Sequence, residues 1–188
     1  MRKIETSLPG VVLLEPEVFG DTRGFFMETY HSEKFRELGI DSVFLQDNHS
    51  LSRRGTLRGL HYQLNNPQAK LCRVVRGEVL DVAVDIRQGS PTFGQWCSAI
   101  LSAENKRQIY IPRGFAHGFF VLSEEAEFLY KCDGFYEPAD QYGILWNDPQ
   151  IGIDWQISAD VEVLLSDKDL ALPLLGQCPI TDLPLFVK

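Results

Sequence analysis

The sequence has no long apolar run and few cysteines, and each shortage excludes a class of protein. No apolar stretch approaches the ~20 residues that a membrane-spanning helix needs, so we expect no membrane partner. The first six residues carry no apolar core of the kind that a signal peptide requires. The four cysteines form no CxxC pair, which argues against a zinc knuckle or a dense disulfide scaffold. We therefore expect a protein of the reducing cytoplasm.

Basic residues are also in the minority. Eighteen Lys and Arg stand against 26 Asp and Glu, which gives a net charge of -8 and argues against nucleic acid as the main partner. A small anionic ligand stays open, because a few local arginines can serve one site. The 188 residues contain 44% hydrophobic residues and no internal repeat or linker. This composition predicts a globular chain with a single domain, residues 1–188.

Short extended segments, separated by Gly, Pro and Asn, dominate the chain. The clearest is 79–86, where the even-numbered residues Leu80 to Ile86 form one apolar face. Asp81 and Asp85 lie on its other face, and we interpret them as solvated or structural, without chemistry. Further strands are expected at 25–30, 44–48, 71–76, 95–101, 107–111, 118–122 and 127–132. The pattern predicts a mainly β protein, a sandwich or a barrel.

Helices are expected only at the periphery. Ser32 can cap a short helix that Gly39 ends, and a second short helix near 166–172 stops before Pro173.

Polar residues on otherwise good strands mark where chemistry is expected, because a barrel encloses a pocket. The densest clusters are 46–50 and 58–63. Along an extended chain, Arg58 lies on one side and both His61 and Gln63 on the other, while Gly59 allows close backbone approach. Further polar positions are Lys70, the 111–119 segment and 130–131.

Two segments resemble the motifs of cupin barrels. Residues 112–117 read Pro-x-Gly-x-x-His, and a histidine-bearing strand leads to the turn at 76–78. Metal-binding cupins carry H-x-H, whereas the second histidine is Gln63 in this chain. Glutamine is a poor ligand for a divalent transition metal, and only His61, His117 and at most Glu78 remain. We therefore expect no metal and no cofactor, and a histidine that moves protons.

The chain also resembles the dTDP-4-dehydrorhamnose 3,5-epimerase family of bacterial rhamnose biosynthesis. The matching segments are spread over nearly its whole length, at 20–28, 46–50, 57–63, 90–96, 101–118, 128–131 and 146–149. The resemblance implies a cupin-type β-barrel (jelly roll) with a few short peripheral helices. It also implies a homodimeric isomerase with strands exchanged between subunits. Its substrate would be a dTDP-linked 4-keto-6-deoxyhexose, dTDP-4-dehydro-6-deoxy-D-glucose, inverted at carbons 3 and 5 to dTDP-4-dehydro-L-rhamnose.

The reaction requires a base on one face of the sugar, a proton donor on the other and a cation or donor at the carbonyl oxygen. By resemblance, His61 is the base and Tyr130 is the donor. Lys70 is matched to the lysine near the enolate oxygen. Asp169 is matched to the carboxylate that orients His61, with Asp167 as a nearby competitor.

The resemblance also implies a set of substrate-binding residues. Arginines suit a diphosphate because the planar guanidinium binds oxygens in pairs, and Phe26 is expected to stack on the thymine. Gln141 stands where many relatives have a glutamate, so a contact there is neutral or lost. For His117, a scaffold role and a substrate contact both stay open. The full set is Arg23, Phe26, Glu28, Gln46, Asp47, Asn48, Arg58, Lys70, His117, Gln141 and Lys168.

Three alternatives remain at this stage. The nearest is an epimerase of one carbon, or a keto-isomerase, that acts on a related dTDP sugar. A non-catalytic cupin that only binds a sugar nucleotide is disfavoured, because pure binding does not require a base that faces a phenol. A metal-dependent dioxygenase is disfavoured by Gln63.

Overall fold

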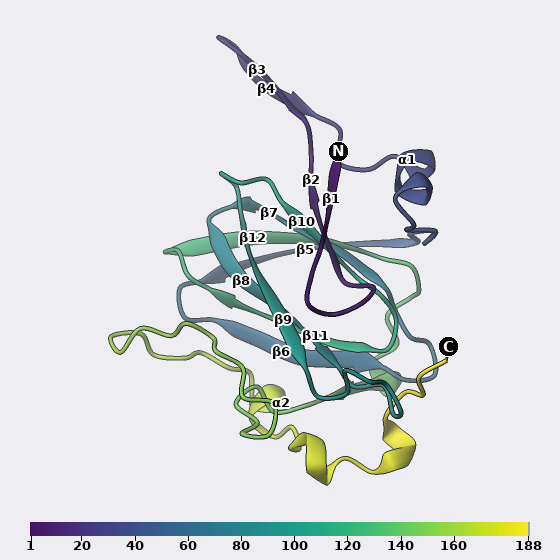
Figure 1. Cartoon of the computed structure of the whole chain (residues 1–188). Helices are drawn as coiled ribbons and strands as arrows, with labels where there is room; N and C mark the ends of the chain where they lie inside the picture. The colour runs from purple at the N-terminus through teal and green to yellow at the C-terminus, as the bar shows by residue number, and fades with distance from the viewer. Residues whose placement is uncertain (188) are drawn as a thin grey trace.

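Two antiparallel sheets pack face to face in the computed structural model, which describes residues 1–187 (Figure 1). Residue 188, the last of the expected domain, lies outside the described residues. The six-stranded sheet has the order β1 (Arg2–Glu5), β2 (Val12–Glu15), β10 (Gln108–Ile111), β7 (Lys70–Arg76), β12 (Glu125–Cys132) and β5 (Gln46–Arg53). The five-stranded sheet has the order β13 (Gln141–Gly143), β6 (Leu57–Gln63), β11 (Phe115–Val121), β8 (Glu78–Asp85) and β9 (Trp96–Ser102).

The prediction of a mainly β jelly roll with short peripheral helices is confirmed, although hydrogen bonds do not close the two sheets into one barrel. The helices are α1 (Ser32–Glu37), α2 (Asp167–Leu170) and the 3-10 turns Pro138–Asp140, Leu175–Gln177 and Ile180–Asp182. Ser166 caps α2 through its side chain, whereas the N-cap of α1 is His31 and not the expected Ser32. No helix in residues 1–187 has the length and apolar character to cross a membrane. The sequence patterns did not predict β1, β2, β3 or β13.

Apolar side chains form three layers. One layer fills the space between the sheets and includes Val74, Phe119 and Phe128. A second covers the outer face of the five-stranded sheet, where the C-terminal segment contributes Trp155 and Leu175. The third lies under α1 on the outer face of the six-stranded sheet. The outer face of the five-stranded sheet is therefore shielded, whereas that of the six-stranded sheet is covered only in part, and Leu51 on β5 stays exposed.

Strand β8 is buried on both faces. Leu80, Val82 and Val84 pack against the C-terminal layer, so Asp81 and Asp85 face the interior. Both carboxylates are fully buried, so of the two expected alternatives the solvated one is wrong and the structural one holds. A period of two defines two faces of a strand, but it does not tell which of them meets water.

Strand β6 contains a bulge that changes which of its side chains share a face. Arg58 pairs with Phe119 and His61 with His117, so three steps along β6 match two steps along β11. The extra residue turns Arg58 to the same side as His61, contrary to the simple alternation expected from the sequence. The expected close approach at Gly59 is confirmed, because a Cβ there would lie 2.5 Å from the Cα atom of Gly118.

A hairpin of β3 (Val18–Asp21) and β4 (Gly24–Met27) projects away from the two sheets at the top of Figure 1. It exposes Phe19, Phe25 and Phe26, with 56%, 59% and 69% of their surfaces accessible. Such a group of apolar side chains on a projecting ribbon is typical of an interaction surface.

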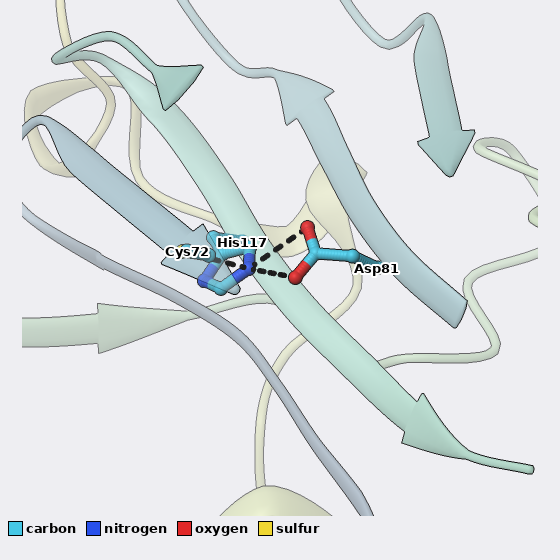
Figure 2. A group of neighbouring side chains, drawn as sticks. All are labelled: Cys72, Asp81 and His117. Atoms are coloured by element: carbon cyan, nitrogen blue, oxygen red, sulfur yellow. Dashed lines mark hydrogen bonds and ion pairs between the residues drawn. The ribbon is translucent and has the colours of Figure 1, made fainter. Parts of the chain in front are cut away.

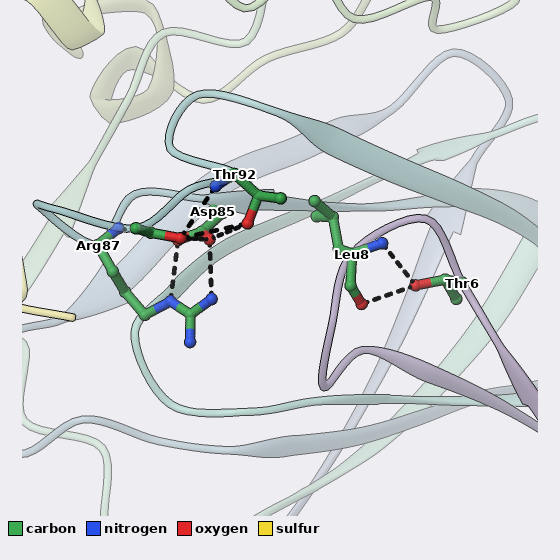
Figure 3. Close-up of polar contacts among 6 residues, drawn as sticks. Thr6, Leu8, Asp85, Arg87 and Thr92 are labelled. Carbon is green, nitrogen blue, oxygen red and sulfur yellow. Dashed lines mark hydrogen bonds and ion pairs between the residues drawn. The ribbon is translucent and has the colours of Figure 1, made fainter. Parts of the chain in front are cut away.

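Asp85 fixes the loop between β8 and β9. Its carboxylate accepts two hydrogen bonds from the Arg87 guanidinium, at 2.9 and 2.8 Å, and others from Ser90 and Thr92 (Figure 3). The guanidinium also lies 4.3 Å over the ring of Phe115. Burial on its own raises the pKa of Asp85, but the hydrogen bonds from Arg87, Ser90 and Thr92 outweigh it, and the pKa is lowered.

We predict that Asp85→Ala lowers the free energy of unfolding by about 3 kcal/mol, because it leaves the half-buried Arg87 guanidinium and two hydroxyl groups without their acceptor. Urea unfolding near pH 7 measures this loss. In the wild type, the stabilisation should be complete above the ~3.9 pKa of an unfolded aspartate and should fall as the pH drops through the lower folded pKa.

Asp160→Ala is the matched control, since Asp160 also pairs with an arginine, Arg54, but is exposed. Its loss should stay below about 1 kcal/mol. Equal losses in the two variants would contradict the role given to the Asp85 network.

Candidate active site

A cavity of about 790 Å³ is lined by side chains of both sheets. Strands β5, β7 and β12 contribute from the six-stranded sheet, and β6 and β11 contribute from the five-stranded sheet. The segment around α2 supplies further lining residues, among them Ser166 and Asp169. A cavity of this size suits a small-molecule ligand larger than a single sugar.

The cavity brings together ten of the residues expected at the site: His61, Lys70, Tyr130, Asp169, Gln46, Asn48, Arg58, His117, Gln141 and Lys168. They come from positions between 46 and 169 in the chain. The strand pairing accounts for part of this convergence, since His117 lies opposite His61 and Tyr130 lies between Asn48 and Cys72.

His61 is held by a carboxylate from the C-terminal segment. Its Nε2 atom lies 2.5 Å from Oδ1 of Asp169, which is buried at the first helical turn of α2. Of the two candidate aspartates, Asp169 makes this contact, while Asp167 is exposed. Burial on its own raises the pKa of Asp169, but the hydrogen bonds with His61 and Ser166 outweigh it, and the pKa is lowered. The carboxylate is therefore ionised near neutral pH, and it fixes the orientation of the ring.

Tyr130 and Lys70 face the cavity from the other sheet. Tyr130 lies on β12 and Lys70 begins β7, so both are carried by strands opposite the one that carries His61. Burial raises the pKa of Tyr130 to about 12. Its hydroxyl group therefore keeps its proton at neutral pH and can donate it.

Polar side chains line the wall that β5 forms. Gln46 donates to the side-chain oxygen of Asn48 at 3.0 Å, and Arg58 donates to Ser52 at 3.2 Å. Because alternate residues of a strand share one face, Gln46 and Asn48 point into the cavity together. Asp47 points the other way, where it pairs with Lys131 at 2.8 Å.

Four expected binding residues are thus not brought to the cavity of the same chain. Besides Asp47, these are three residues on or next to the projecting hairpin. Arg23 pairs with Asp21, Phe26 is exposed, and Glu28 pairs with Lys34 at 2.7 Å.

Tyr136 lines the cavity although the sequence analysis did not single it out. The sequence feature that could have indicated it is its position as an aromatic residue in the Gly- and Pro-containing loop after the strand of Tyr130. The backbone N–H of Tyr136 donates to Gln46 at 2.9 Å, and its hydroxyl group donates to Gln141. Two of the expected binding residues therefore also hold this loop.

Gln63 fastens the same loop. Its amide nitrogen donates to the carbonyl groups of Asn66, at 2.7 Å, and Phe135, at 3.1 Å, and its oxygen accepts from the N–H of Glu137 at 2.8 Å. The side chain that replaces the second histidine of H-x-H is thus committed to backbone groups. Glu78, the remaining candidate ligand, does not line the cavity.

A second group of side chains extends from His117, in the cavity wall, to residues of the neighbouring strands. Cys72, Asp81 and His117 come from β7, β8 and β11, and their potential ligand atoms lie within 4.8 Å of one another (Figure 2). Cys72, Cys97 and Cys132 are buried free thiols.

We predict that Gln63→Leu lowers the free energy of unfolding by roughly 3 kcal/mol, because three backbone groups lose their partner and the buried amide of Gln63 is removed. Chemical denaturation of the purified protein measures the change.

Gln68→Leu is the control, since Gln68 makes one such bond, to the carbonyl oxygen of Gly134 at 2.8 Å. Its loss should be about 1 kcal/mol. If Gln63→Leu loses no more unfolding free energy than Gln68→Leu, the stability of the loop does not depend on the Gln63 side chain.

Comparisons with known proteins agree on one family. A family model described as dTDP-4-dehydrorhamnose 3,5-epimerase matches residues 5–177. The protein of that name from Salmonella typhimurium is 58% identical over 181 residues, 95% of this chain and 98% of its own. A crystal structure of dTDP-6-deoxy-D-glucose-3,5-epimerase from Legionella pneumophila, in complex with dTDP-4-keto-L-rhamnose, is 50% identical with a TM-score of 0.96, covering 100% of this chain and 99% of its own. A crystal structure of a 3'-monoepimerase from Streptomyces bikiniensis in complex with dTDP-quinovose is 38% identical with a TM-score of 0.89. The match covers 96% of this chain and 91% of the other.

Proposed function

This chain belongs to the dTDP-4-dehydrorhamnose 3,5-epimerase family, and we propose that it converts dTDP-4-dehydro-6-deoxy-D-glucose to dTDP-4-dehydro-L-rhamnose. One observation carries the assignment beyond the family: His61 and Tyr130 line one cavity from strands of opposite sheets. An inversion needs a proton acceptor on one face of the carbon and a proton donor on the other. The two sheets supply these two faces.

Each inversion is a pair of proton transfers. His61 takes the proton from the carbon next to the 4-keto group, and the electron pair of the broken C–H bond moves into an enolate. The Tyr130 hydroxyl group then gives its proton to the opposite face of the same carbon. Solvent removes the proton from His61 and returns one to Tyr130, so no redox partner or metal is consumed. The same cycle at the second carbon completes the reaction.

Lys70 stabilises the enolate in this proposal. Its ammonium group enters the cavity from β7, next to the strand that carries Tyr130. A cation placed before the reaction at the oxygen that becomes negative lowers the barrier, because it does not have to reorganise as charge develops. Asp169 keeps the His61 ring oriented, so that the nitrogen opposite the carboxylate is the one that takes the proton.

We also propose that the active form is a homodimer in which the β3–β4 hairpin of one subunit reaches the cavity of the other. Within one chain, Arg23, Phe26 and Glu28 lie away from the cavity that they are expected to serve. The exposed phenylalanines of the hairpin need a cover, and a second copy would provide it. Arg23 would then add a guanidinium for the diphosphate beside Arg58. Each chain of this dimer would form a single domain, and the dimer would be located in the cytoplasm.

An epimerase of one carbon is the second candidate, favoured by the likeness to the 3'-monoepimerase. Exchange of substrate hydrogens with solvent separates the two functions.

We predict that in deuterium oxide the substrate gains deuterium at carbons 3 and 5, counted by NMR, and that a chelator changes nothing. His61→Asn should abolish exchange and leave dTDP binding largely intact. Tyr130→Phe should still exchange deuterium, because His61 can remove and return a proton on its own face, but it should form little inverted product.

Lys70→Ala is the contrasting variant, since it should suppress exchange and inversion together by roughly a hundredfold or more. Deuterium at one carbon only would favour the single-carbon epimerase. Equal loss of exchange and inversion in Tyr130→Phe would contradict its role as the donor.

The shared site is tested by co-expressing two inactive chains with different tags and purifying the mixed dimer. One chain carries His61→Asn and an intact hairpin, and the other carries Arg23→Ala and an intact cavity. If the hairpin serves the partner, the mixed dimer holds one complete site and should show about half the wild-type activity.

Each parent dimer, purified in the same way, is the control. A mixed dimer no more active than the mean of its parents would overturn the exchange of hairpins. That outcome would not bear on the proposed epimerase activity.

A further inference from the structure

Asp81 is a buried carboxylate that the proposed mechanism leaves without a task. It is fully buried in the middle of β8, on the face directed between the sheets. Its Oδ1 and Oδ2 atoms lie 3.1 and 3.0 Å from Nε2 of His117 (Figure 2). An ionised carboxylate is costly to bury without a hydrogen-bond donor. Nε2 of His117 is the side-chain donor that reaches it.

This contact decides which nitrogen of His117 carries the proton. A carboxylate accepts hydrogen bonds only, so Nε2 must be the N–H nitrogen of the ring. Burial lowers the pKa of His117 more strongly than its contact with Asp81 raises it. The ring is therefore neutral, and its other nitrogen, Nδ1, holds a lone pair.

Nδ1 has access to the cavity. His117 lines the cavity and keeps 7% of its side-chain surface accessible. Nδ1 of His117 has no hydrogen-bond partner within the described part of the chain. Among residues 1–187, the side-chain nitrogen or oxygen atom that is both fully buried and without a partner belongs to His31. Nδ1 of His117 is therefore not fully buried. The ring packs against Phe128, with 6.2 Å between the ring centroids, which holds its plane in place.

We propose that Asp81 is a positioning residue for the epimerisation, which holds the proton of His117 on Nε2 and so presents Nδ1 to the cavity as a neutral acceptor for a hydroxyl group of the sugar. The inference rests on the proposed function, because it needs a sugar in this cavity. It assigns to Asp81 a task that the sequence pattern did not suggest.

The neutral ring also suits the charges around it. His117 faces His61 on β6, Lys70 and Cys72 on β7, Asp81 on β8 and the Phe128 ring on β12. A protonated His117 would add a cation beside both Lys70 and the base. It would make the acceptance of a proton by His61 less favourable, since like charges that lie close together in a half-buried site repel each other.

A metal ion held by Cys72, Asp81 and His117 is the competing interpretation of this group. Metal binding requires a thiolate, and burial raises the pKa of the Cys72 thiol well above its usual value. The Cys72 sulfur lies 4.0 Å from Nε2, while the carboxylate already occupies that nitrogen. The hydrogen-bonded pair therefore explains the geometry without an ion.

The first experiment needs no variant of Asp81. Nitrogen-15 NMR of histidine-labelled wild-type protein distinguishes the two neutral tautomers from imidazolium, and the four histidines are assigned by replacing them one at a time. His117 should be the neutral Nε2–H tautomer from pH 6 to 8, and its Nδ1 signal should shift when the sugar nucleotide is added but not with dTDP alone. An Nδ1–H tautomer or an imidazolium would overturn the proposal.

The second experiment uses Asp81→Asn, whose amide can donate to Nε2 and force the proton onto Nδ1, as known for the analogous change in a catalytic triad. We expect kcat/KM for the sugar nucleotide to fall roughly tenfold to a hundredfold, while the Kd for dTDP, which lacks the sugar, stays unchanged. Cys72→Ala is the control and should retain the wild-type tautomer and kcat/KM.

The outcomes separate the possible failures. Unchanged kcat/KM in a folded Asp81→Asn protein would overturn the proposal, and so would stoichiometric binding of Co²⁺ with a thiolate charge-transfer band. If that variant does not fold, the tautomer of wild-type His117 and its response to the sugar decide alone. Absence of solvent exchange in the wild type would instead refute the proposed function.

Discussion

The packing of the C-terminal segment against the five-stranded sheet is the constraint on which the rest of the structure depends. It covers the outer face of β6, β8 and β11 with apolar side chains such as Trp155 and Leu175. Asp81, His61 and His117 of these strands then lie on the inner face, where each must find a partner. The same segment brings Asp169 to His61. One packing arrangement therefore both directs the polar groups into the space between the sheets and orients the proposed base.

Sequence patterns correctly predicted the strands and helices whose formation depends on nearby residues. Alternation located most of the long strands, and Ser166 correctly indicated the start of α2. The motif resemblance supplied His61 and its companions, and the fold gathers them in one cavity. What failed depends on distant parts of the chain. The burial of Asp81 requires knowledge of the segment that covers β8 from outside, and the side on which Arg58 lies depends on a bulge relative to β11.

The hairpin residues show a different limit of a single sequence. Arg23 and Phe26 carry a family pattern, yet within this chain they line a small hollow on the projecting hairpin, away from the two sheets. In the proposed dimer these residues serve the partner's cavity, and reasoning about one copy cannot place such a pattern. Tyr136 shows the opposite case, since it lines the cavity from a loop whose shape is set by glutamines of three other elements. Its position follows from tertiary hydrogen bonds and not from a local motif.

Two histidine–carboxylate pairs stand side by side on β6 and β11, and burial gives them different chemistry. In each pair, Nε2 of the histidine contacts the aspartate carboxylate, so Nδ1 is the ring nitrogen available for another partner. His61 keeps 28% of its side-chain surface accessible, so water and substrate reach it and it can exchange protons. His117 keeps 7% and rests against Phe128, in surroundings that disfavour its charged form. In the proposed mechanism, which needs Lys70 as a cation and His61 as a base, a neighbour that remains neutral is an advantage. In the proposed mechanism the same pair of residue types serves proton transfer in one place and orientation in the other, and the different exposure of the two rings makes the difference.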